Sequence, residues 1–478
     1  MNNIVIVGGG TSGWSAAAFL SKNPKLNVTI IEPSDIPTIG VGESTIPYIN
    51  IIHRDMELDV FKTPEWINKV DGSLKFSIEF ADFNRIGEKW IHPFLVTDSN
   101  DTIMSAMTCN SALPLNIYKS QPDYVNDNYI LPNMRSQTFT TPEKQNEDGR
   151  LSQVGYHIDA TKYAQLLKEE SLKRSNLSLI DTHVTDIAVK DQSVSSLTLS
   201  NGETITADLF IDCTGFKALL SNAVDSKWDT SYSDRLFVDS ALAVQLPYRN
   251  KETQMRNTTY CHALQNGWVW NVPLQTRIGT GYVYSSRHTS EDDARMEFKK
   301  HLNEMYGYKE EEVKLRKLKF DVGIRRESWK NNVVAVGLSS FFLEPIESTA
   351  ISTMHYQIYT IYNMLMTDYI LPKDKIKRFN QINNLAVDAI ASYIELHYTM
   401  TKRTDSQFWK DVASIELTNE QKNTIDLYVD TAKKFNRNTL KATTNGHSLF
   451  DQSSYLFLYL GYDLLPNNTY SMADPEIL

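Results

Sequence analysis

The residues Asn3-Ile4-Val5-Ile6-Val7-Gly8-Gly9-Gly10-Thr11-Ser12-Gly13 decide the fold of this chain. The apolar residues 3–7 predict a buried parallel strand, the alanine-rich residues 14–22 a helix, and residues 27–32 a second strand. The spacing Gly8-x-Gly10-x-x-Gly13 falls between the first strand and the helix, where glycines permit a tight turn and let the backbone approach a pyrophosphate. The sequence therefore predicts an α/β fold that begins with a doubly wound, dinucleotide-binding βαβ unit.

The positions of further candidate cofactor-binding segments along the chain indicate which dinucleotide is bound. Glu32 ends the second strand nineteen residues after Gly13, where an acid would accept a hydrogen bond from a ribose hydroxyl. An apolar strand that ends in Asp212-Cys213-Thr214-Gly215, and another that runs into Gly337, offer further places for close backbone approach. A domain that binds only NAD rarely has cofactor-binding segments so late in its sequence, whereas FAD lies extended across interleaved modules. We therefore expect FAD.

Candidate cofactor-binding strands occur at the start of the chain, near residue 208 and near residue 333, which predicts two interleaved modules. An amphipathic helix is expected over residues 163–174, and a long helix is expected from about Ser348, with mostly helical structure from there on. We expect a Rossmann-like, GR2-type FAD-binding module over residues 1–48, 153–220 and 318–360. A substrate-binding module, made of a β-sheet and C-terminal helices, is expected over residues 49–152, 221–317 and 361–478. The polar stretch 119–153 is expected to be a long loop, either a lid or a disordered segment.

The composition excludes several classes of protein. The chain has 478 residues, 41% of them hydrophobic, which is ordinary for a soluble protein of about two or three domains. Its net charge of −10 provides no basic surface for nucleic acid. Cys109, Cys213 and Cys261 are far apart and odd in number, which predicts neither disulfides nor a metal site and suits a reducing cytosol. No signal-peptide pattern and no apolar run of about 18 residues is present, so we expect a cytoplasmic protein without a membrane anchor.

The segment Gly267-Trp268-Val269-Trp270-Asn271-Val272-Pro273 is the second informative motif. Side chains two residues apart lie on the same face of a strand, so both indoles point the same way. Pro273 cannot continue the ladder and should end the strand. By itself this pattern is typical of an aromatic pair packed under a sheet.

The two motifs together resemble those of the flavin-dependent halogenases, the tryptophan-halogenase-like family. Further segments resemble this family's flavin strap, its lysine segment, its substrate wall, the loop of its second catalytic residue and its C-terminal motifs. In order along about residues 1–466, these segments are Ile39–Pro47, Gly72–Phe80, Trp90–Phe94, Leu343–Thr349, His397-Tyr398, Thr401–Arg403 and Phe408-Trp409.

The resemblance implies a two-component halogenase. In such enzymes reduced FAD reacts with O2 to form a flavin C4a-hydroperoxide, which oxidises halide to hypohalous acid. The acid then passes through a tunnel to a lysine beside the substrate. A separate flavin reductase would supply the reduced FAD, and this chain has no obvious second dinucleotide motif. Trp268 and Trp270 would be walls that keep the organic substrate away from the flavin. The expected FAD-binding residues are Gly8, Gly10, Thr11, Ser12, Gly13, Glu32, Gly42, Glu43, Val184, Asp212, Gly337, Leu338 and Ile351.

Lys75 would be the catalytic lysine by this resemblance. On pattern alone, the segment Ser73–Phe80 is one half-buried strand with Lys75 on its wet face. In a tunnel, a desolvated lysine can lose its proton and attack the halogen as a free amine. If it stays protonated, it can instead hydrogen-bond to hypohalous acid and polarise it. Both mechanisms remain open at this point.

Glu347 would be the second catalytic residue, either orienting hypohalous acid or taking the proton from the arene. An acid in the first turn of a helix can also simply compensate the helix dipole. The same helix start offers backbone N–H groups at Thr349 and Ala350 as a halide site. Ala350 stands where the family usually has glycine, and alanine cannot adopt glycine-only backbone angles. We therefore expect a differently shaped halide site and leave the halide open.

The substrate is expected to be an electron-rich aromatic molecule. His92 and Phe94 would form walls that stack on it, although a histidine packed beside a proline is an alternative for His92. The segment after Trp409 lacks the aromatic and acidic cluster that holds the amino-acid backbone in tryptophan-specific members. Free tryptophan is therefore not favoured, and an indole or a phenol is.

Two other functions compete with the halogenase hypothesis. One is a flavin-dependent aromatic hydroxylase, and the other is a catalytically idle flavoprotein that binds a partner or a small molecule. We expect no metal and no nucleic acid, and a homodimer is compatible with the sequence.

Overall fold

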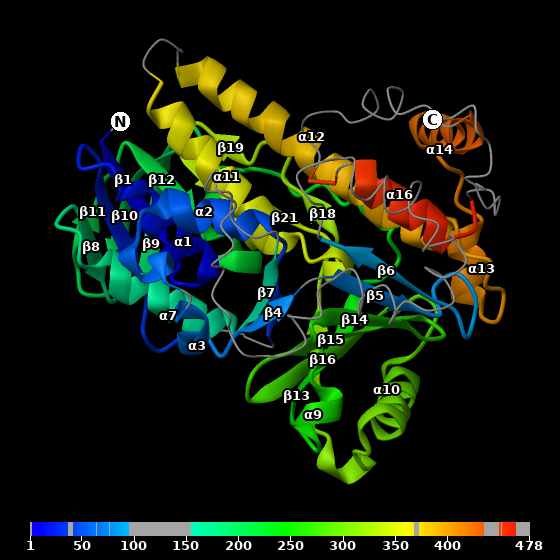
Figure 1. Ribbon diagram of the computed structural model, residues 1–478. Helices are drawn as coiled ribbons and strands as arrows, with labels where there is room; N and C mark the ends of the chain where they lie inside the picture. Colours follow the sequence, from blue (N-terminus) through cyan, green and yellow to red (C-terminus); the bar gives the residue numbers. More distant parts are fainter. Residues whose placement is uncertain are drawn as a thin grey trace, which may run out of the picture.

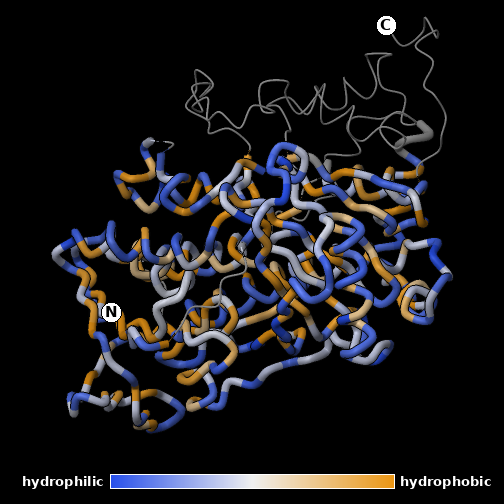
Figure 2. The backbone as a smooth tube through the Cα atoms, turned by 90° about the horizontal axis from the view of Figure 1, so that it is seen from below, coloured by the Kyte–Doolittle hydropathy of each residue, from blue (hydrophilic) through white to orange (hydrophobic). Residues whose placement is uncertain are grey.

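A computed structural model describes residues 2–36, 42–63, 65–75, 77–94, 154–367, 372–434, 449–450 and 452–464 (Figure 1). The expected loop 119–153 and residues 39–41 of the strap segment lie outside these described residues. Hydrophobic and hydrophilic segments alternate along the backbone, as they do where buried strands are joined by exposed connections (Figure 2). No helix in the described part of the chain is long and apolar enough to cross a membrane.

A six-stranded sheet lies on the left of Figure 1 and contains the first motif. Strand β1 (Asn3–Val7) lies at its centre and pairs in parallel with β2 (Asn27–Ile31) and β12 (Leu209–Asp212). Helix α1 (Thr11–Leu20) follows β1 and begins at the glycine-rich turn, three residues earlier than predicted. The remaining strands are β8 (Leu177–Ile180), β20 (Val333–Ala335) and the antiparallel edge strand β19 (Trp329–Lys330). The doubly wound α/β class is confirmed.

Helices cover this sheet and connect it to the rest of the molecule. Helices α7 (Ala160–Ser171) and α11 (Ala350–Leu365) both contact α1. A small sheet of β11 (Thr204–Ile205), β10 (Ser193–Leu199) and β9 (Val184–Lys190) lies nearby. The shorter helices of this part are α2 (Tyr48–Met56), η1 (Asp59–Lys62), α3 (Trp66–Lys69), η3 (Gly215–Lys217), α8 (Leu219–Ala223) and η6 (Gly337–Ser339).

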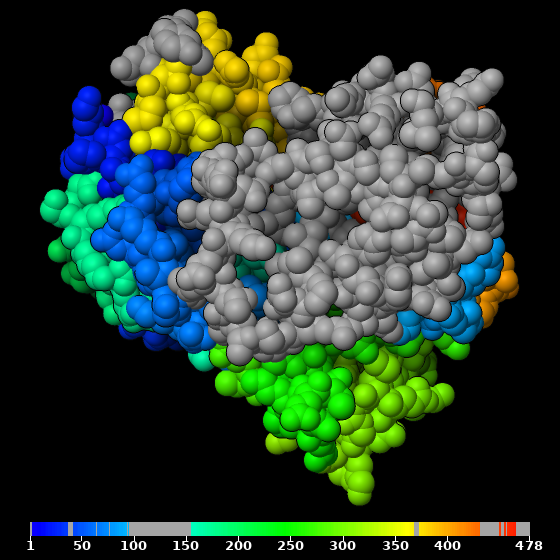
Figure 3. All heavy atoms as spheres, in the orientation of Figure 1, coloured from blue at the N-terminus to red at the C-terminus, as the bar shows by residue number. Residues whose placement is uncertain are grey.

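A seven-stranded sheet forms the second large unit and contains the tryptophan motif. Its order is β17-β13-β16-β15-β14-β5-β6, and all its pairs are antiparallel except β14 with β5. Helix α10 (Glu291–Tyr306) packs on one face and projects at the lower end of the molecule (Figures 1 and 3). The strands are β5 (Ser77–Ala81), β6 (Lys89–Pro93), β13 (Ser240–Pro247), β14 (Thr258–Ala263), β15 (Gly267–Pro273), β16 (Arg277–Tyr284) and β17 (Arg316–Lys319).

A three-stranded sheet joins the two units. Strand β7 (Gly155–Ile158) lies between β3 (Glu43–Ser44) and β4 (Ser73–Lys75), and both pairs are antiparallel. The prediction of one continuous strand over residues 73–80 is wrong, because β4 belongs to this small sheet and β5 to the seven-stranded sheet. Hydrophobic alternation does not reveal such a change of partner, since both strands have the same period.

The C-terminal part is helical, as predicted. Helix α12 (Pro372–Thr399) packs beside α11, and α16 (Gln452–Gly461) contacts β6. One core cluster of buried side chains includes residues from both sheets and from these helices. The strands of the six-stranded sheet all come from the ranges expected for the FAD-binding module, but the module boundaries themselves stay a prediction. The remaining elements are η4 (Ser231–Asp234), α9 (Lys251–Gln254), η5 (Glu310–Glu312), β18 (Gly323–Ile324), β21 (Phe341–Phe342), η7 (Pro345–Glu347), α13 (Gln407–Ala413) and α14 (Asn419–Lys434).

Candidate active site

Lys75 is the last residue of β4, and its side chain is 0% exposed. The interpretation that placed it on a wet strand face is therefore wrong. Its Nζ donates a hydrogen bond of 2.8 Å to Ser348 Oγ and lies 4.7 Å from the centroid of the Phe94 ring. Burial lowers the pKa of Lys75 to about 7, and the negative charge of Glu347 opposes this shift without cancelling it. A lysine in this environment exchanges its proton near neutral pH.

The loop that receives this hydrogen bond has an unusual backbone. Ser348 follows the turn η7 and has a φ of 58°, in the left-handed region that residues other than glycine seldom adopt. Helix α11 starts two residues later, and no side chain of the described residues caps its N-terminus. Such strain is found mostly where the surrounding structure holds a functional group in place.

Thr349 and Ala350 lie where the halide site was predicted, at the start of α11. Ala350 is the first residue of the helix and needs no glycine-only angles there. The backbone angles of Ala350 therefore give no reason to expect a differently shaped halide site. The first-turn N–H groups have no side-chain cap and are suited to an anion.

Two histidines hold Glu347 from elements far away in the sequence. The carboxylate is buried, and His92 Nδ1 lies 2.9 Å from Oε2 while His397 Nε2 lies 2.8 Å from Oε1. Burial alone would raise the pKa of Glu347, but the charges and hydrogen bonds of the two histidines lower it to about 2. Glu347 is thus a carboxylate throughout the neutral range.

The hydrogen bonds of His397 define its proton state. Its Nδ1 lies 3.1 Å from the carbonyl oxygen of Tyr393, which can only accept, so Nδ1 carries a proton. Its Nε2 faces the ionised carboxylate of Glu347, which also only accepts. Both ring nitrogens therefore act as donors, and His397 is the counter-ion of Glu347. The geometry does not assign this task to Lys75.

Trp268 and Trp270 point from the same face of β15, as predicted, with ring centroids 6.5 Å apart. Trp268 is fully buried, and its Nε1 donates to Glu344 Oε2 at 3.0 Å. The Tyr398 hydroxyl donates to the same oxygen at 2.6 Å. Burial raises the pKa of Glu344 to about 7, although both hydrogen bonds oppose the shift. The first indole is therefore fixed by the loop that also carries Glu347.

His92 and Phe94, the expected substrate walls, lie beside this group. The His92 ring is buried, and its second nitrogen, Nε2, lies 3.0 Å from Ser454 Oγ of α16. The centroids of the two rings are 6.0 Å apart, and Phe94 lies against Lys75. One wall residue thus contacts the carboxylate and the other contacts the lysine.

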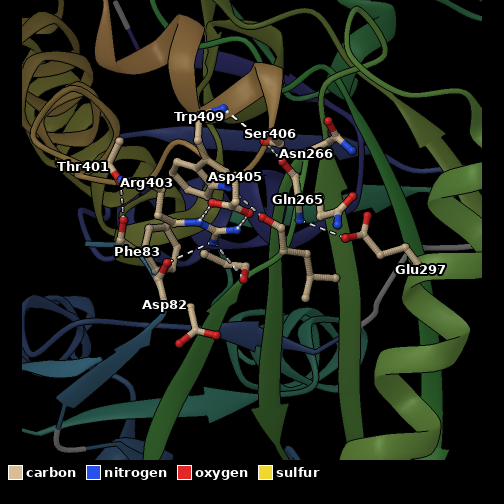
Figure 4. Close-up of polar contacts among 12 residues, drawn as sticks. Asp82, Phe83, Gln265, Asn266, Glu297, Thr401, Arg403, Asp405, Ser406 and Trp409 are labelled. Atoms are coloured by element: carbon tan, nitrogen blue, oxygen red, sulfur yellow. Dashed lines mark hydrogen bonds and ion pairs between the residues drawn. The ribbon is translucent and has the colours of Figure 1, made fainter. Parts of the chain in front are cut away.

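The C-terminal motif residues fasten the helices to the seven-stranded sheet (Figure 4). Arg403 forms two hydrogen bonds with the carboxylate of Asp405 and donates to the carbonyls of Asp82 and Ala263. Its guanidinium lies 4.4 Å from the Trp409 ring centroid. Thr401, Arg403 and Trp409 therefore have a structural role here, because they donate hydrogen bonds to backbone carbonyls at or just beyond the ends of β5 and β14.

The glycine turn fits a bound pyrophosphate. A Cβ on Gly8 would lie 2.3 Å from the Cys213 carbonyl oxygen, and one on Gly13 would lie 1.8 Å from the Gly8 carbonyl oxygen. Among the described residues, nothing would lie within 4 Å of a Cβ on Gly10, so they leave the space in front of the helix open. Gly10 is the N-cap of α1 and no side chain caps that helix, which leaves the N–H groups of Thr11 and Ser12 for phosphate oxygens.

The other expected FAD residues differ in what they already bind. Glu32 lies across the glycine turn, and its oxygens accept from Trp14 Nε1 at 3.2 Å and from Lys168 Nζ at 2.7 Å. Asp212 is buried, and the backbone and hydroxyl groups of Thr214 and Ser221 occupy both its oxygens. Asp212 therefore joins the turn after β12 to helix α8.

Burial raises the pKa of Glu43 in β3 to about 7. Gly42 precedes β3, Val184 begins β9, Leu338 is exposed on η6 and Ile351 is buried in α11.

Sequence reasoning missed several members of this site. Ser348 and Glu344 lie inside a recognised motif but have ordinary residue types, and His397 was noted without a role. Ser454 carries no sequence signal at all. The side chains that they bind across the site lie between 50 and 362 residues away in the sequence, which one sequence without relatives does not disclose.

The sequence of this chain also matches known proteins. Residues 3–475 match the family model described as tryptophan halogenase. Among curated proteins, the tryptophan 7-halogenase RebH of Lentzea aerocolonigenes is 30% identical over 446 residues, which is 90% of this chain and 82% of that protein. The match therefore extends over nearly the whole chain.

Solved structures agree with the sequence match. Xcc4156, a flavin-dependent halogenase from Xanthomonas campestris, superposes with a TM-score of 0.80 at 30% identity, covering 97% of this chain and 89% of that one. A tryptophan halogenase from Shewanella frigidimarina superposes with a TM-score of 0.82 at 25% identity, covering 100% and 91%. The arrangement of elements is thus shared with these structures at 25% to 30% sequence identity.

Proposed function

Because this chain belongs to the tryptophan halogenase family, we propose that it uses reduced FAD, O2 and halide to halogenate an electron-rich aromatic molecule. The single observation that carries this proposal is the buried Lys75, held by Ser348 beside the clamped carboxylate of Glu347. Buried ionisable groups with strongly shifted pKa values cluster at functional sites, so a buried amine next to a carboxylate is a candidate reactive group.

FAD is the cofactor that these residues would hold. The glycine turn, Thr11 and Ser12 would receive the pyrophosphate at the start of α1, and Glu32 would accept a hydrogen bond from a ribose hydroxyl. Reduced FAD and O2 would supply the oxidising equivalent that converts halide to hypohalous acid. A separate flavin reductase would deliver the reduced FAD.

Lys75 receives the halogen in this proposal. At pH values above about 7 its side chain is mostly a neutral amine. Its lone pair can attack the halogen of hypohalous acid, so that an N–halogen bond forms, the O–halogen bond breaks, and the amine proton leaves with hydroxide as water. The Ser348 hydroxyl orients the nitrogen without adding a charge. The halogen is thereby carried on an atom that the structure fixes in place.

Glu347 acts on the arene side of this reaction. Electrophilic attack places positive charge on the aromatic ring, and a fixed carboxylate stabilises it. The ring must then lose a proton, and Glu347 is ionised and able to accept it. His92 and His397 keep the carboxylate oriented. Thr349 and Ala350 would hold halide at the uncapped start of α11.

The substrate is proposed to be an indole or phenol rather than free tryptophan. His92 and Phe94 present rings beside Lys75 and Glu347, which suits an aromatic molecule. Relatives are named tryptophan halogenases, but the segment after Trp409 lacks an aromatic and acidic cluster for an amino-acid backbone.

A panel of indoles, phenols and tryptophan, incubated with FAD, a flavin reductase, NADH and each of chloride, bromide and iodide, tests the proposal by mass spectrometry. Halogenated products that require both halide and Lys75 are expected. Hydroxylated products formed without halide would instead favour an aromatic hydroxylase. The Lys75→Ala variant should still oxidise reduced flavin while forming no halogenated arene.

A further inference from the structure

His157 lies at the centre of the sheet that carries Lys75. On β7 it is the cross-strand neighbour of Ser44 in β3 and of Ser73 in β4. Its side chain is 0% exposed, and Nδ1 lies 3.0 Å from Ser73 Oγ while Nε2 lies 2.9 Å from Thr259 Oγ1. Thr259 belongs to β14 of the seven-stranded sheet, so the imidazole connects the two sheets.

The donor and the acceptor in each hydrogen bond around His157 can be assigned. Ser73 Oγ donates to the carbonyl oxygen of Pro273 at 2.5 Å, and a hydroxyl has only one proton to give. Ser73 must therefore accept from His157, which places the imidazole proton on Nδ1. The unprotonated Nε2 then accepts from the Thr259 hydroxyl, and Thr259 accepts from Ser44 Oγ at 2.7 Å.

Burial keeps His157 in the neutral form that this assignment requires. Desolvation lowers the pKa of His157 well below its usual value, and the nearby charge of Lys75 lowers it further. A protonated imidazole would donate from both nitrogens and would reverse the hydroxyls of Thr259 and Ser44. The neutral form with its proton on Nδ1 is therefore the one that satisfies Ser73.

This chain of bonds joins the lysine strand to the tryptophan strand. Strand β4 has three residues and pairs only with β7 within the described sheets, so its own ladder holds it weakly. Pro273 ends β15, which carries both tryptophans, and Gln275 in the following turn also donates to the Gly72 carbonyl at 2.8 Å. Lys75 lies two residues beyond Ser73, at the C-terminal end of β4, where it pairs with Gly155 of β7.

We infer that His157 is a positioning residue for Lys75, because through Ser73 it locks the strand of the lysine to the end of the strand of the tryptophan pair. This role rests on the proposed function. It does not require His157 to touch the substrate, the halide or the flavin.

Three variants separate positioning from general stability. In His157→Asn the amide can replace the Nδ1 donor to Ser73, whereas in His157→Gln the amide reaches toward Thr259 and leaves Ser73 without its donor. Ser73→Ala removes the acceptor. His301→Phe is the matched control, because His301 is a buried histidine of α10 outside this group.

We expect His157→Gln and Ser73→Ala each to lower kcat for halogenation about tenfold to a hundredfold, with KM for the arene and Kd for FAD within about twofold. The double variant should lose no more than either single one, because both break the same link. His157→Asn should stay within about threefold of wild type, and His301→Phe should leave kcat unchanged. Normal kcat in His157→Gln, or additive losses in the double variant, would overturn the inference.

NMR of protein labelled with 15N-histidine provides a readout that does not depend on activity. The His157 signals, assigned by their loss in His157→Gln, should show a protonated Nδ1 and a bare Nε2 at pH 7 to 8. A proton on Nε2 would refute the hydrogen-bond direction even if the enzyme halogenates. A wild-type protein that halogenates no arene, but has the expected tautomer, would refute the proposed function and leave the hydrogen-bond chain intact.

Discussion

Lys75 Nζ and Ser348 Oγ are 2.8 Å apart, although 273 residues separate them in the sequence. The acceptor is a neutral hydroxyl, and both carboxylate oxygens of nearby Glu347 are bound by His92 and His397. Within the described part of the chain, Lys75 is thus buried without a directly bound counter-ion, which is why its proton is held weakly. The reactivity proposed for this amine follows from that pairing.

The rate of halogenation should rise with pH and reach half its maximum near pH 7. The pKa of Lys75 in the folded protein is about 7, and only the neutral amine has a lone pair for the halogen. Initial rates of arene halogenation across pH 6 to 9 would show this, with the rate of flavin oxidation measured in parallel as the control. A halogenation rate that falls through pH 7 would mean that the ammonium form acts.

Replacing Lys75 by methionine should stabilise the protein by a few kcal/mol at pH 7. The folded-state pKa of about 7 lies below the ordinary value of 10.5, so the unfolded chain binds more protons between these two values. Wild-type stability should therefore rise with pH over this window, and the advantage of Lys75→Met should shrink towards pH 10. Urea unfolding at a series of pH values measures this. A constant difference between the two proteins would contradict the burial argument.

Replacing His397 by asparagine should lower kcat by about a hundredfold. The variant removes the Nε2 donor to Glu347, so the carboxylate loses one of its two anchors and part of the interaction that lowers its pKa, while His92 still binds the other oxygen. His262→Asn is the control, since His262 makes a comparable 2.9 Å contact with Asp82 away from Lys75. Equal losses of kcat in both variants would indicate a general effect on folding.

Replacing Glu344 by alanine should reduce the amount of halogenated arene formed per flavin oxidised. Trp268 would lose the acceptor for its indole N–H, and the ring would no longer be held as a wall. Glu344→Gln keeps an oxygen acceptor and should remain close to wild type. Tyr398→Phe removes the other donor to the same carboxylate and should leave the product ratio unchanged, because Trp268 keeps its bond. An unchanged ratio of halogenated arene to oxidised flavin in Glu344→Ala would contradict the role of Trp268 as a wall.

Acid should unfold this protein through its buried histidines. Burial lowers the pKa of His301 and of His355 to about 3 in the folded state. Their unfolded pKa is about 6.5, so their contribution to stability is complete above pH 6.5 and is lost as the pH falls towards 3. Unfolding free energies between pH 4 and pH 7 should fall less steeply in His355→Phe than in wild type.

The doubly wound fold was predictable because its signal is local. The strand, turn and helix of the first unit occupy residues 3–20, and each element's period and its glycines agree with the others. The tryptophan strand was predicted for the same reason. Glu347 and the start of α11 could be placed only as a motif, since nothing nearby in the sequence indicates which side chains would bind the carboxylate.

The sequence by itself therefore determined the doubly wound module, the dinucleotide turn, the shared face of Trp268 and Trp270, and the residue types available for chemistry. Only the tertiary structure decided that Lys75 is buried, that Ser348 holds it, and that His397 balances Glu347. The reason is physical. Secondary structure follows from periodicity over a few residues, whereas burial, pKa and proton position depend on groups that folding brings together from distant parts of the chain.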